Sequence, residues 1–205
     1  KVVVKSIHSE YLDKENISKK LFQLDGIIVA PGFGQRGLNG KILAVEHARV
    51  NKIPFLGICL GMQMAVIEYA RNVKKMRYAN STEISEKCKD PVIDLMTSQK
   101  EIVNMGGTMR LGAWDCEIEK NTKSYKSYKK KLISERHRHR YEFNNNYTDK
   151  IFDDKFIIAG SNPETKLVEI IENIDHPWFV GVQFHPEYKS SVYNPHPIFV
   201  NFVKA

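Results

Sequence analysis

A cysteine stands between two glycines where an apolar run meets a helix-forming run, in PFLGICLGMQMAV (residues 54–66). The segment GICLG (57–61) has the spacing of a sharp strand-to-helix turn that carries a nucleophile. Glycine allows such a turn because a Cβ at either position would clash. The free N–H groups of the following helix favour a thiolate, so we expect the pKa of Cys59 to lie below the ordinary ~8.5. The alternative is a structural cysteine, because free cysteine is often buried.

A candidate base follows a second apolar run, in GVQFHPEY (181–188). His185 comes just after the predicted strand, and Glu187 lies two residues further on, which puts both side chains on one face of an extended segment. Glu187 can then orient the imidazole as the third member of a triad, and Pro186 keeps the segment extended. The alternative is an ordinary surface histidine–glutamate pair.

Acyl chemistry also needs N–H donors for a developing oxyanion. The N–H of Leu60 directly follows the thiol. The turn PGFGQRG (31–37) comes after a neighbouring apolar run, and the Gly32 N–H can face the cysteine, whereas Pro31 has no N–H. A phosphate-binding turn and a plain strand-to-helix turn are the alternatives.

A parallel sheet would bring these groups together, because ligands collect beyond the carboxyl ends of parallel strands. Short apolar runs, typical of strands buried on both faces, alternate with helix-like stretches in the first third of the chain. The predicted strands are 1–7, 26–30 and 54–58. One predicted helix follows the first strand and ends near residue 22, and two others cover 41–50 and 61–73.

The pattern changes after residue 72, where strand-like runs follow one another with few long helices between them. The predicted strands are 91–96, 108–119, 156–160, 166–172 and 178–184, with a mobile loop at 97–107 and a closing helix at 196–205. We therefore predict an α/β fold in one domain (1–205). It has an open twisted, mostly parallel, flavodoxin-like sheet flanked by helices, with antiparallel strands at the edge in the second half.

Composition limits the function classes. The chain has 205 residues, of which 42% are hydrophobic and 27% charged, as in a globular domain. No apolar run approaches the ~20 residues of a membrane span, and the first residues lack the features of a signal peptide. Cys59, Cys88 and Cys116 are far apart and form no Cys-x-x-Cys pair, which argues against disulfides and zinc. We predict a cytoplasmic protein with no membrane segment and no metal.

The formal charge is +7, and much of the excess lies in residues 119–135. A solvated, lysine-rich surface is the favoured interpretation, and attraction to anionic ligands or nucleic acid is the alternative. No nucleic-acid-binding motif accompanies this segment, so we predict no nucleic-acid partner.

Together, GICLGMQ, PGFGQRG and GVQFHPE resemble the class I (triad-type) glutamine amidotransferases. NSTE (80–83), GGTMRLG (106–112) and ERHRHRYE (135–142) are similar, in that order, to the glutaminase domains of the CTP synthase family. The resemblance covers residues 25–205 and implies glutamine hydrolysis through a γ-glutamyl thioester. The ammonia would pass to a synthetase domain that uses ATP and Mg to aminate UTP to CTP.

The resemblance also implies residue roles. Cys59 would be the nucleophile, His185 the base and Glu187 its orienter, while Glu83 would accept the α-ammonium of glutamine and Arg140 its α-carboxylate. The residues implied in glutamine binding are Gly32, Leu60, Gly61, Met62, Gln63, Glu83 and Arg140.

Some of these residues have other interpretations. Glu83 could be part of a helix cap after NST. Strand alternation in 135–143 would put the three arginines on one face and both histidines on the other. That basic face is either solvated or a ligand site, and three converging arginines favour an anion.

No cofactor is expected in this domain, and the resemblance implies GTP as an allosteric activator. The candidates for GTP binding are Phe33, Arg36, Gly37 and Arg138. Two positions differ from the family pattern: Pro31 removes one loop N–H, and Asn39 stands where an acidic residue is usual. The implied partners are glutamine and the synthetase domain of the same protein, assembled as a homo-oligomer, a tetramer.

Two other functions stay open at this point. One is a different thiol γ-glutamyl hydrolase on the same fold. The other is a catalytically idle nucleotide-sensing or assembly module. Glutamine turnover, and its response to GTP, separates the three functions.

Overall fold

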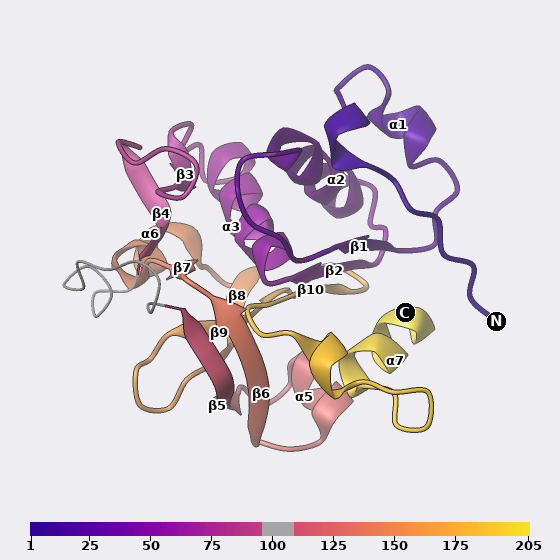
Figure 1. Cartoon of the computed structure of the whole chain (residues 1–205), viewed down its shortest axis with the longest axis vertical. Helices are drawn as coiled ribbons and strands as arrows, with labels where there is room; N and C mark the ends of the chain where they lie inside the picture. The colour runs from indigo at the N-terminus through magenta and orange to yellow at the C-terminus, as the bar shows by residue number, and fades with distance from the viewer. Residues whose placement is uncertain (96–108) are drawn as a thin grey trace.

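The computed structural model describes residues 1–95 and 109–205. Helices cover both faces of its larger sheet (Figure 1). The described strands are β1 (Ile27–Val29), β2 (Phe55–Ile58), β3 (Ala79–Ser81), β4 (Asp90–Leu95), β5 (Arg110–Ile118), β6 (Leu132–His139), β7 (Tyr141–Phe143), β8 (Phe156–Ser161), β9 (Val168–Asn173) and β10 (Phe179–Val182). The helices are α1 (Ile17–Lys20), α2 (Leu38–Val50), α3 (Leu60–Asn72), α5 (Lys123–Tyr128), α6 (Thr148–Ile151) and α7 (Pro197–Lys204), with 3-10 turns η1 (Ser9–Tyr11), η3 (Asn145–Tyr147) and η4 (Pro186–Lys189).

The described strands form a seven-stranded sheet in the order β1-β2-β10-β9-β8-β5-β6, and a smaller sheet in the order β3-β4-β7. Strand β2 pairs in parallel with β1 and β10, whereas β9, β8, β5 and β6 continue the larger sheet with antiparallel pairings. The predicted α/β sheet with antiparallel strands in its second half is confirmed. The antiparallel part extends beyond the edge and includes four strands.

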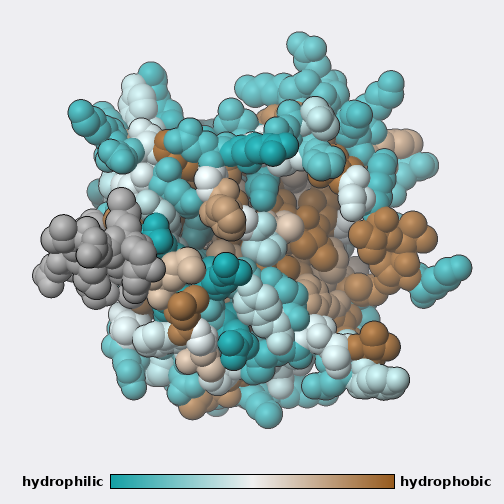
Figure 2. Space-filling model, viewed as in Figure 1, coloured by the Kyte–Doolittle hydropathy of each residue, from teal (hydrophilic) through white to brown (hydrophobic). Residues whose placement is uncertain are grey.

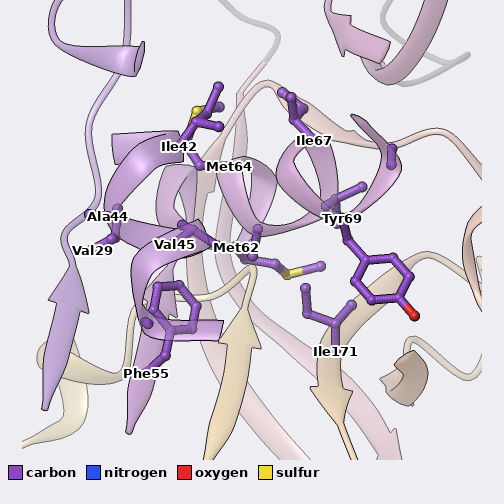
Figure 3. Packing of buried hydrophobic residues seen from close by; sticks show 14 of the residues in the cluster. Val29, Ile42, Ala44, Val45, Phe55, Met62, Met64, Ile67, Tyr69 and Ile171 are labelled. Carbon is purple, nitrogen blue, oxygen red and sulfur yellow. The ribbon is translucent and has the colours of Figure 1, made fainter. Parts of the chain in front are cut away.

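Two apolar clusters lie on the two faces of the larger sheet. Phe55 of β2 belongs to the cluster under α2 and α3 (Figure 3). Its ring stacks on that of Phe179, with 4.4 Å between the ring centroids. The next residue, Leu56, belongs to the cluster that includes side chains of α5 and α7. Successive strand residues point to opposite faces, so continuous apolar runs serve both clusters at once.

The first residues differ from the prediction of a strand. Residues 1–8 have no regular structure, and Val3 is 88% exposed. A strand needs a neighbour for its N–H and C=O groups, and this segment pairs with none in the described part of the chain. Strand β1 is at the edge of the sheet and Ile28 is half-exposed, although burial on both faces was predicted. Figure 2 shows hydrophobic surface on the side where the N-terminal segment lies.

The helix predicted to end near residue 22 is reduced to the short elements η1 and α1. The Asp13 carboxylate accepts hydrogen bonds from the N–H groups of Glu15 and Asn16, which forms a local turn that competes with helix. The loop predicted at 97–107 lies outside the described residues. None of the described helices is long and apolar enough to cross a bilayer.

Close packing explains the two glycines around Cys59. A Cβ added to Gly61 would lie 2.1 Å from the Val29 carbonyl oxygen, and one added to Gly57 would lie 2.7 Å from the Gly61 carbonyl. Both distances are far shorter than van der Waals contact, and the atoms involved are backbone. Helix α3 therefore starts directly against β1, and only glycine fits between them.

We expect Gly61→Ala to lower the free energy of unfolding by about 3 kcal/mol, because α3 must move away from β1 to admit the methyl group. Urea unfolding followed by circular dichroism measures this change. Gly32→Ala is the matched control, since its Cβ would meet its nearest neighbour at 3.4 Å. Equal stability losses in the two variants would contradict the packing argument.

Candidate active site

Cys59 occupies the junction between β2 and α3 with φ 51° and ψ −103°. Positive φ is strained for a residue with a Cβ. The junction is held from both sides: the Cys59 N–H donates to the Val182 carbonyl at 2.7 Å, and the Cys59 carbonyl accepts from the Gln63 N–H at 3.2 Å. The Leu60 N–H bonds to the sulfur. The strand-to-helix turn predicted from the sequence is confirmed.

The prediction of a low pKa at Cys59 is wrong for this structure. The residue is 4% exposed, and its burial raises the pKa of the thiol to about 12, although the Leu60 N–H acts in the opposite direction. The nearby carboxylates of Glu187, Glu83 and Glu142 raise it further. Sequence motifs indicate the helix terminus but not how completely the thiol is removed from water. The resting sulfur is therefore a neutral thiol.

His185 follows the end of β10, the strand that pairs in parallel with β2. Its Nδ1 lies 2.6 Å from a Glu187 carboxylate oxygen, and its backbone N–H donates to the Arg136 carbonyl at 2.8 Å. Its Nε2 is buried and has no hydrogen-bond partner within residues 1–95 and 109–205. Because β2 and β10 end at the same edge, Cys59 and His185 both follow strand ends at that edge. The predicted histidine–glutamate pair is present.

Contacts between η4 and neighbouring elements hold the segment that includes Glu187. Lys189 in η4 donates to the Ser134 carbonyl and lies 3.7 Å from the buried carboxylate of Glu135. The Glu135 carboxylate also contacts the Tyr128 hydroxyl and the His196 imidazole, each at 3.0 Å. These contacts join α5, β6 and α7 to η4, which includes Glu187.

The glycine-rich turn covers the start of α3. The position of a Cβ on Gly32 is 3.4 Å from the Leu60 side chain and 3.5 Å from the Lys41 ammonium. Gly32 and Leu60 are thus neighbours, as two oxyanion donors must be. The Glu83 carboxylate accepts from the Gly34 N–H at 2.8 Å, which joins this turn to the segment after β3. Glu83 lies in a turn, so the helix-cap interpretation is wrong.

The other predicted glutamine-binding residues lie in different settings. The Gln63 amide donates to the Tyr141 carbonyl at 2.8 Å and to the Gln183 side chain at 3.3 Å. Met62 is fully buried in the apolar cluster beneath α3, so only its backbone can face the site. Arg140 is half-buried at the bend between β6 and β7.

Alternation along β6 is confirmed. His137 and His139 are buried, whereas Arg136 and Arg138 are exposed, and Arg140 lies just beyond the strand. Arg136 and Arg138 line a cavity of about 500 Å³, whose other lining residues are Leu111, Gly112, His137 and Tyr188.

The remaining GTP candidates belong to the turn before α2. Phe33 is 87% exposed, Gly37 has a left-handed backbone (φ 68°), and the Arg36 guanidinium pairs with Glu10 at 2.7 Å. None of the three lines the cavity beside Arg138.

Sequence reasoning missed two residues. The Gln183 amide contacts the Cys59 sulfur at 3.6 Å. The Lys41 ammonium donates to the Ala30 carbonyl at 3.2 Å, and a thiolate charge on Cys59 would act on it. Burial lowers the pKa of Lys41, while that charge raises it. Helical spacing from the glycine-rich turn could have indicated Lys41, whereas a glutamine inside an apolar run gives no signal.

Comparisons with known proteins agree with this geometry. All of residues 1–205 match the family model described as glutamine amidotransferase class-I. The chain belongs to this family. It is 60% identical over 205 residues to a CTP synthase of Flavobacterium johnsoniae and 55% identical over 204 residues to one of Clostridium acetobutylicum. It is covered completely in both cases but spans only 38% of the length of each relative.

Solved structures are similar as well. The Trypanosoma brucei CTPS glutaminase domain with bound acivicin has a TM-score of 0.92 and 38% identity, covering 99% of this chain and 80% of that one. A glutamine amidotransferase from Thermotoga maritima has a TM-score of 0.53 at 16% identity, covering 82% of this chain and 58% of that one, and shows the fold alone. Within the described residues, no group of three or more His, Cys, Asp or Glu side chains is arranged to hold a metal ion.

We expect Lys41→Met to slow alkylation of Cys59 by iodoacetamide at pH 8 roughly tenfold, because removing a nearby cation raises the thiol pKa and leaves less thiolate. Mass mapping of the adduct separates Cys59 from Cys88 and Cys116. Lys130→Met, which removes an exposed lysine, is the control. Equal rates in the two variants would show that Lys41 does not act on the sulfur.

Proposed function

We propose that this chain is the glutaminase domain of a CTP synthase, which hydrolyses glutamine to glutamate and ammonia. The observation that carries the proposal is Cys59 on a strained junction at the sheet edge where His185 and Glu187 also lie. The likeness to the Trypanosoma brucei CTPS glutaminase domain supports it.

The first half of the reaction begins with proton transfer. The His185 Nε2 takes the Cys59 proton, and the sulfur attacks the side-chain amide carbon of glutamine. Negative charge develops on the amide oxygen, and the N–H groups of Gly32 and Leu60 are assigned as its hydrogen-bond donors. The imidazolium returns its proton to the amide nitrogen, the C–N bond breaks and ammonia leaves. A γ-glutamyl thioester remains on Cys59.

Water completes the cycle. The neutral His185 takes a proton from water as the oxygen attacks the thioester carbon, and the C–S bond breaks as the sulfur regains a proton. Glu187 keeps the imidazole in one tautomer, because its carboxylate accepts the Nδ1 proton at 2.6 Å. Glutamate is released and the thiol is restored.

Substrate recognition uses charge at both ends of the amino acid. Arg140 is assigned to the α-carboxylate, which its planar guanidinium can bind through two hydrogen bonds. Glu83 is assigned to the α-ammonium. Backbone groups of Gly61 and Met62 and the amide of Gln63 complete the site. Because the Glu83 carboxylate also binds the Gly34 N–H, substrate would compete for it or share it.

The rest of the reaction belongs to segments outside this chain. The relatives are more than twice as long, so we assign ATP, Mg and UTP to a synthetase domain that receives the ammonia. A cytoplasmic tetramer with GTP as activator completes the proposal. Arg138 beside its cavity, and Phe33, Arg36 and Gly37 on the turn before α2, are the candidates for GTP. Pro31 and Asn39, which differ from the family pattern, bear on the strength of this response.

We expect Cys59→Ala in the full-length protein to abolish glutamine hydrolysis while CTP synthesis from added ammonia continues, because only the thioester route is lost. Glutamate release and CTP formation are measured separately, with and without GTP. Cys116→Ala, at a second buried cysteine, is the control. Hydrolysis that survives in Cys59→Ala would refute the mechanism.

The same assay tests the other functions. Nucleotide-independent cleavage of γ-glutamyl peptides would indicate a different thiol hydrolase. GTP binding without turnover in the full-length protein would indicate an idle sensing module.

We expect Arg140→Met to raise the KM for glutamine roughly 10- to 100-fold with a smaller change in kcat, since a charged hydrogen-bond pair contributes about 1.5–3 kcal/mol. Steady-state kinetics without GTP provides both constants. Arg138→Met, two positions earlier on the exposed face, should leave this KM unchanged. A KM that is the same in Arg140→Met and the parent would remove Arg140 from the site.

A further inference from the structure

Five ionisable side chains form a closed ring in the protein interior, near the catalytic pair. Each of these side chains is at most 3% exposed. They come from four strands: Arg110 from β5, His137 and His139 from β6, Glu142 from β7 and Glu169 from β9. No part of the proposed catalytic steps uses them.

The contacts run around the ring without a break. The Arg110 guanidinium lies 3.3 Å from one oxygen of Glu142 and 2.7 Å from one oxygen of Glu169. The second oxygen of Glu169 faces His137 Nε2 at 3.5 Å, and the second oxygen of Glu142 faces His139 Nδ1 at 3.8 Å. His137 Nδ1 and His139 Nε2 close the ring at 2.9 Å.

The link between the two histidines limits where protons can be. A 2.9 Å contact between two ring nitrogens needs one proton between them. If His137 donates, its Nε2 has no proton and can only accept, so Glu169 must supply one. If His139 donates, its Nδ1 can only accept, and Glu142 must supply the proton. With neutral histidines, both glutamates can bond to the nitrogens that face them only if one of the two is protonated, in either arrangement.

The facing atoms are poorly placed for any other hydrogen bond, although the Tyr141 backbone acts on His139. His137 Nε2, His139 Nδ1 and the oxygens opposite them are buried without a hydrogen-bond partner among the described residues. Two ionised glutamates would leave these nitrogens and oxygens unpaired and would give the ring a net negative charge. A buried unpaired group and a buried net charge are both costly.

We propose that the ring holds one carboxyl proton, shared between Glu142 and Glu169 through the two histidines, and is electrically neutral beside the nucleophile. Arg110 balances the one remaining carboxylate. The proton has two resting places, one on each glutamate, because both histidines exchange donor and acceptor roles when it moves. The ring joins β5, β6, β7 and β9 in the sheet without adding charge near Cys59.

The environment of the ring favours a protonated glutamate and neutral histidines. Burial raises the pKa of Glu142 to about 8 and that of Glu169 to about 7, although Arg110 opposes both shifts. Burial also lowers the pKa of His139 to about 3, so the imidazoles stay neutral. Three other groups face the ring. His185 acts on both ring histidines, and Cys116 is near Glu169. The Trp114 ring packs against the Arg110 guanidinium.

The ring bears on the proposed function through Cys59. The Glu142 carboxylate is one of the charges that raise the pKa of the Cys59 thiol. A proton on Glu142 therefore favours ionisation of the sulfur, whereas a proton on Glu169 leaves the charge beside it. This consequence rests on Cys59 being the nucleophile, but the proton count does not.

The test is amide substitution. Glu142→Gln and Glu169→Gln each supply the missing hydrogen permanently, because the amide NH₂ donates where the protonated carboxyl did. Each single variant should fold and be at least as stable as the parent at pH 7, because only the parent must bind a proton on folding at that pH. The double variant leaves Arg110 without an anion and should shift the unfolding equilibrium at least 100-fold or fail to fold.

Linkage gives a second readout. Between pH 5.5 and 7 the folded ring retains a proton that the unfolded glutamates have lost, so the parent loses stability as pH rises. The single variants lack this proton. Relative to either of them, the unfolding constant of the parent should increase about tenfold per pH unit, which is one proton. Urea unfolding at several pH values measures it.

Glu68→Gln is the matched control. The Glu68 carboxylate is fully buried and binds Arg49 through both oxygens, at 2.6 and 2.8 Å, with no second carboxylate in the pair. Its loss should be strongly destabilising at pH 7, unlike the loss of either ring carboxylate. If both ring variants are as unstable as Glu68→Gln, or if their pH curves run parallel to that of the parent, the shared proton is refuted.

A final measurement separates this proposal from the glutaminase assignment. Alkylation of Cys59 at pH 8 should be several-fold faster in Glu142→Gln than in Glu169→Gln, because only the first removes the charge beside the sulfur. This rate and the unfolding curves need no glutamine turnover. The proton count therefore stands or falls independently of the proposed function, and equal alkylation rates would overturn the coupling to Cys59.

Discussion

The backbone at Cys59 has a positive φ, which residues with a Cβ disfavour. The direction of the Cys59 side chain depends on the contacts that hold this conformation. Helix α3 starts in contact with β1, which requires glycine at 61, and the Cys59 N–H is bound by Val182 of β10. Three strands of the sheet therefore determine the direction of one side chain. A strained residue persists where its surroundings leave it no other conformation, and here those surroundings are backbone atoms of β1, β2 and β10.

Burial of Cys59 also determines when its sulfur can carry a charge. Burial of Cys59 suppresses the free thiolate, although a site closed to water also strengthens the hydrogen bonds that would stabilise an oxyanion. The two requirements are compatible if charge appears only during the reaction. His185 can then accept the proton while Leu60, Lys41 and the end of α3 stabilise the negative charge. A thiol that is neutral at rest is also protected from oxidation, since thiolate character governs that reactivity.

The sequence predicted the elements whose cause is local. Continuous apolar runs predicted β2 and β10, and glycine spacing predicted the junction at Cys59. Alternation in β6 correctly separated buried histidines from exposed arginines. The errors concern properties that depend on distant residues. The segment 1–7 has a strand-like composition but no partner among the described residues, and the pKa of Cys59 depends on burial that no local motif shows.

The buried histidines show what pattern alone leaves open. Alternation correctly put His137 and His139 on the inner face of β6, where a neutral imidazole could be a core residue, a base or a metal ligand. Their role depends on Arg110, Glu142 and Glu169, which lie on three other strands and meet them only in the folded protein. A carboxylate near Cys59 opposes ionisation of the thiol. The buried Arg110 nevertheless needs a carboxylate to balance its charge, and a buried carboxylate needs Arg110. A ring that retains one proton meets both requirements, because it satisfies Arg110 and still leaves the region beside Cys59 without net charge.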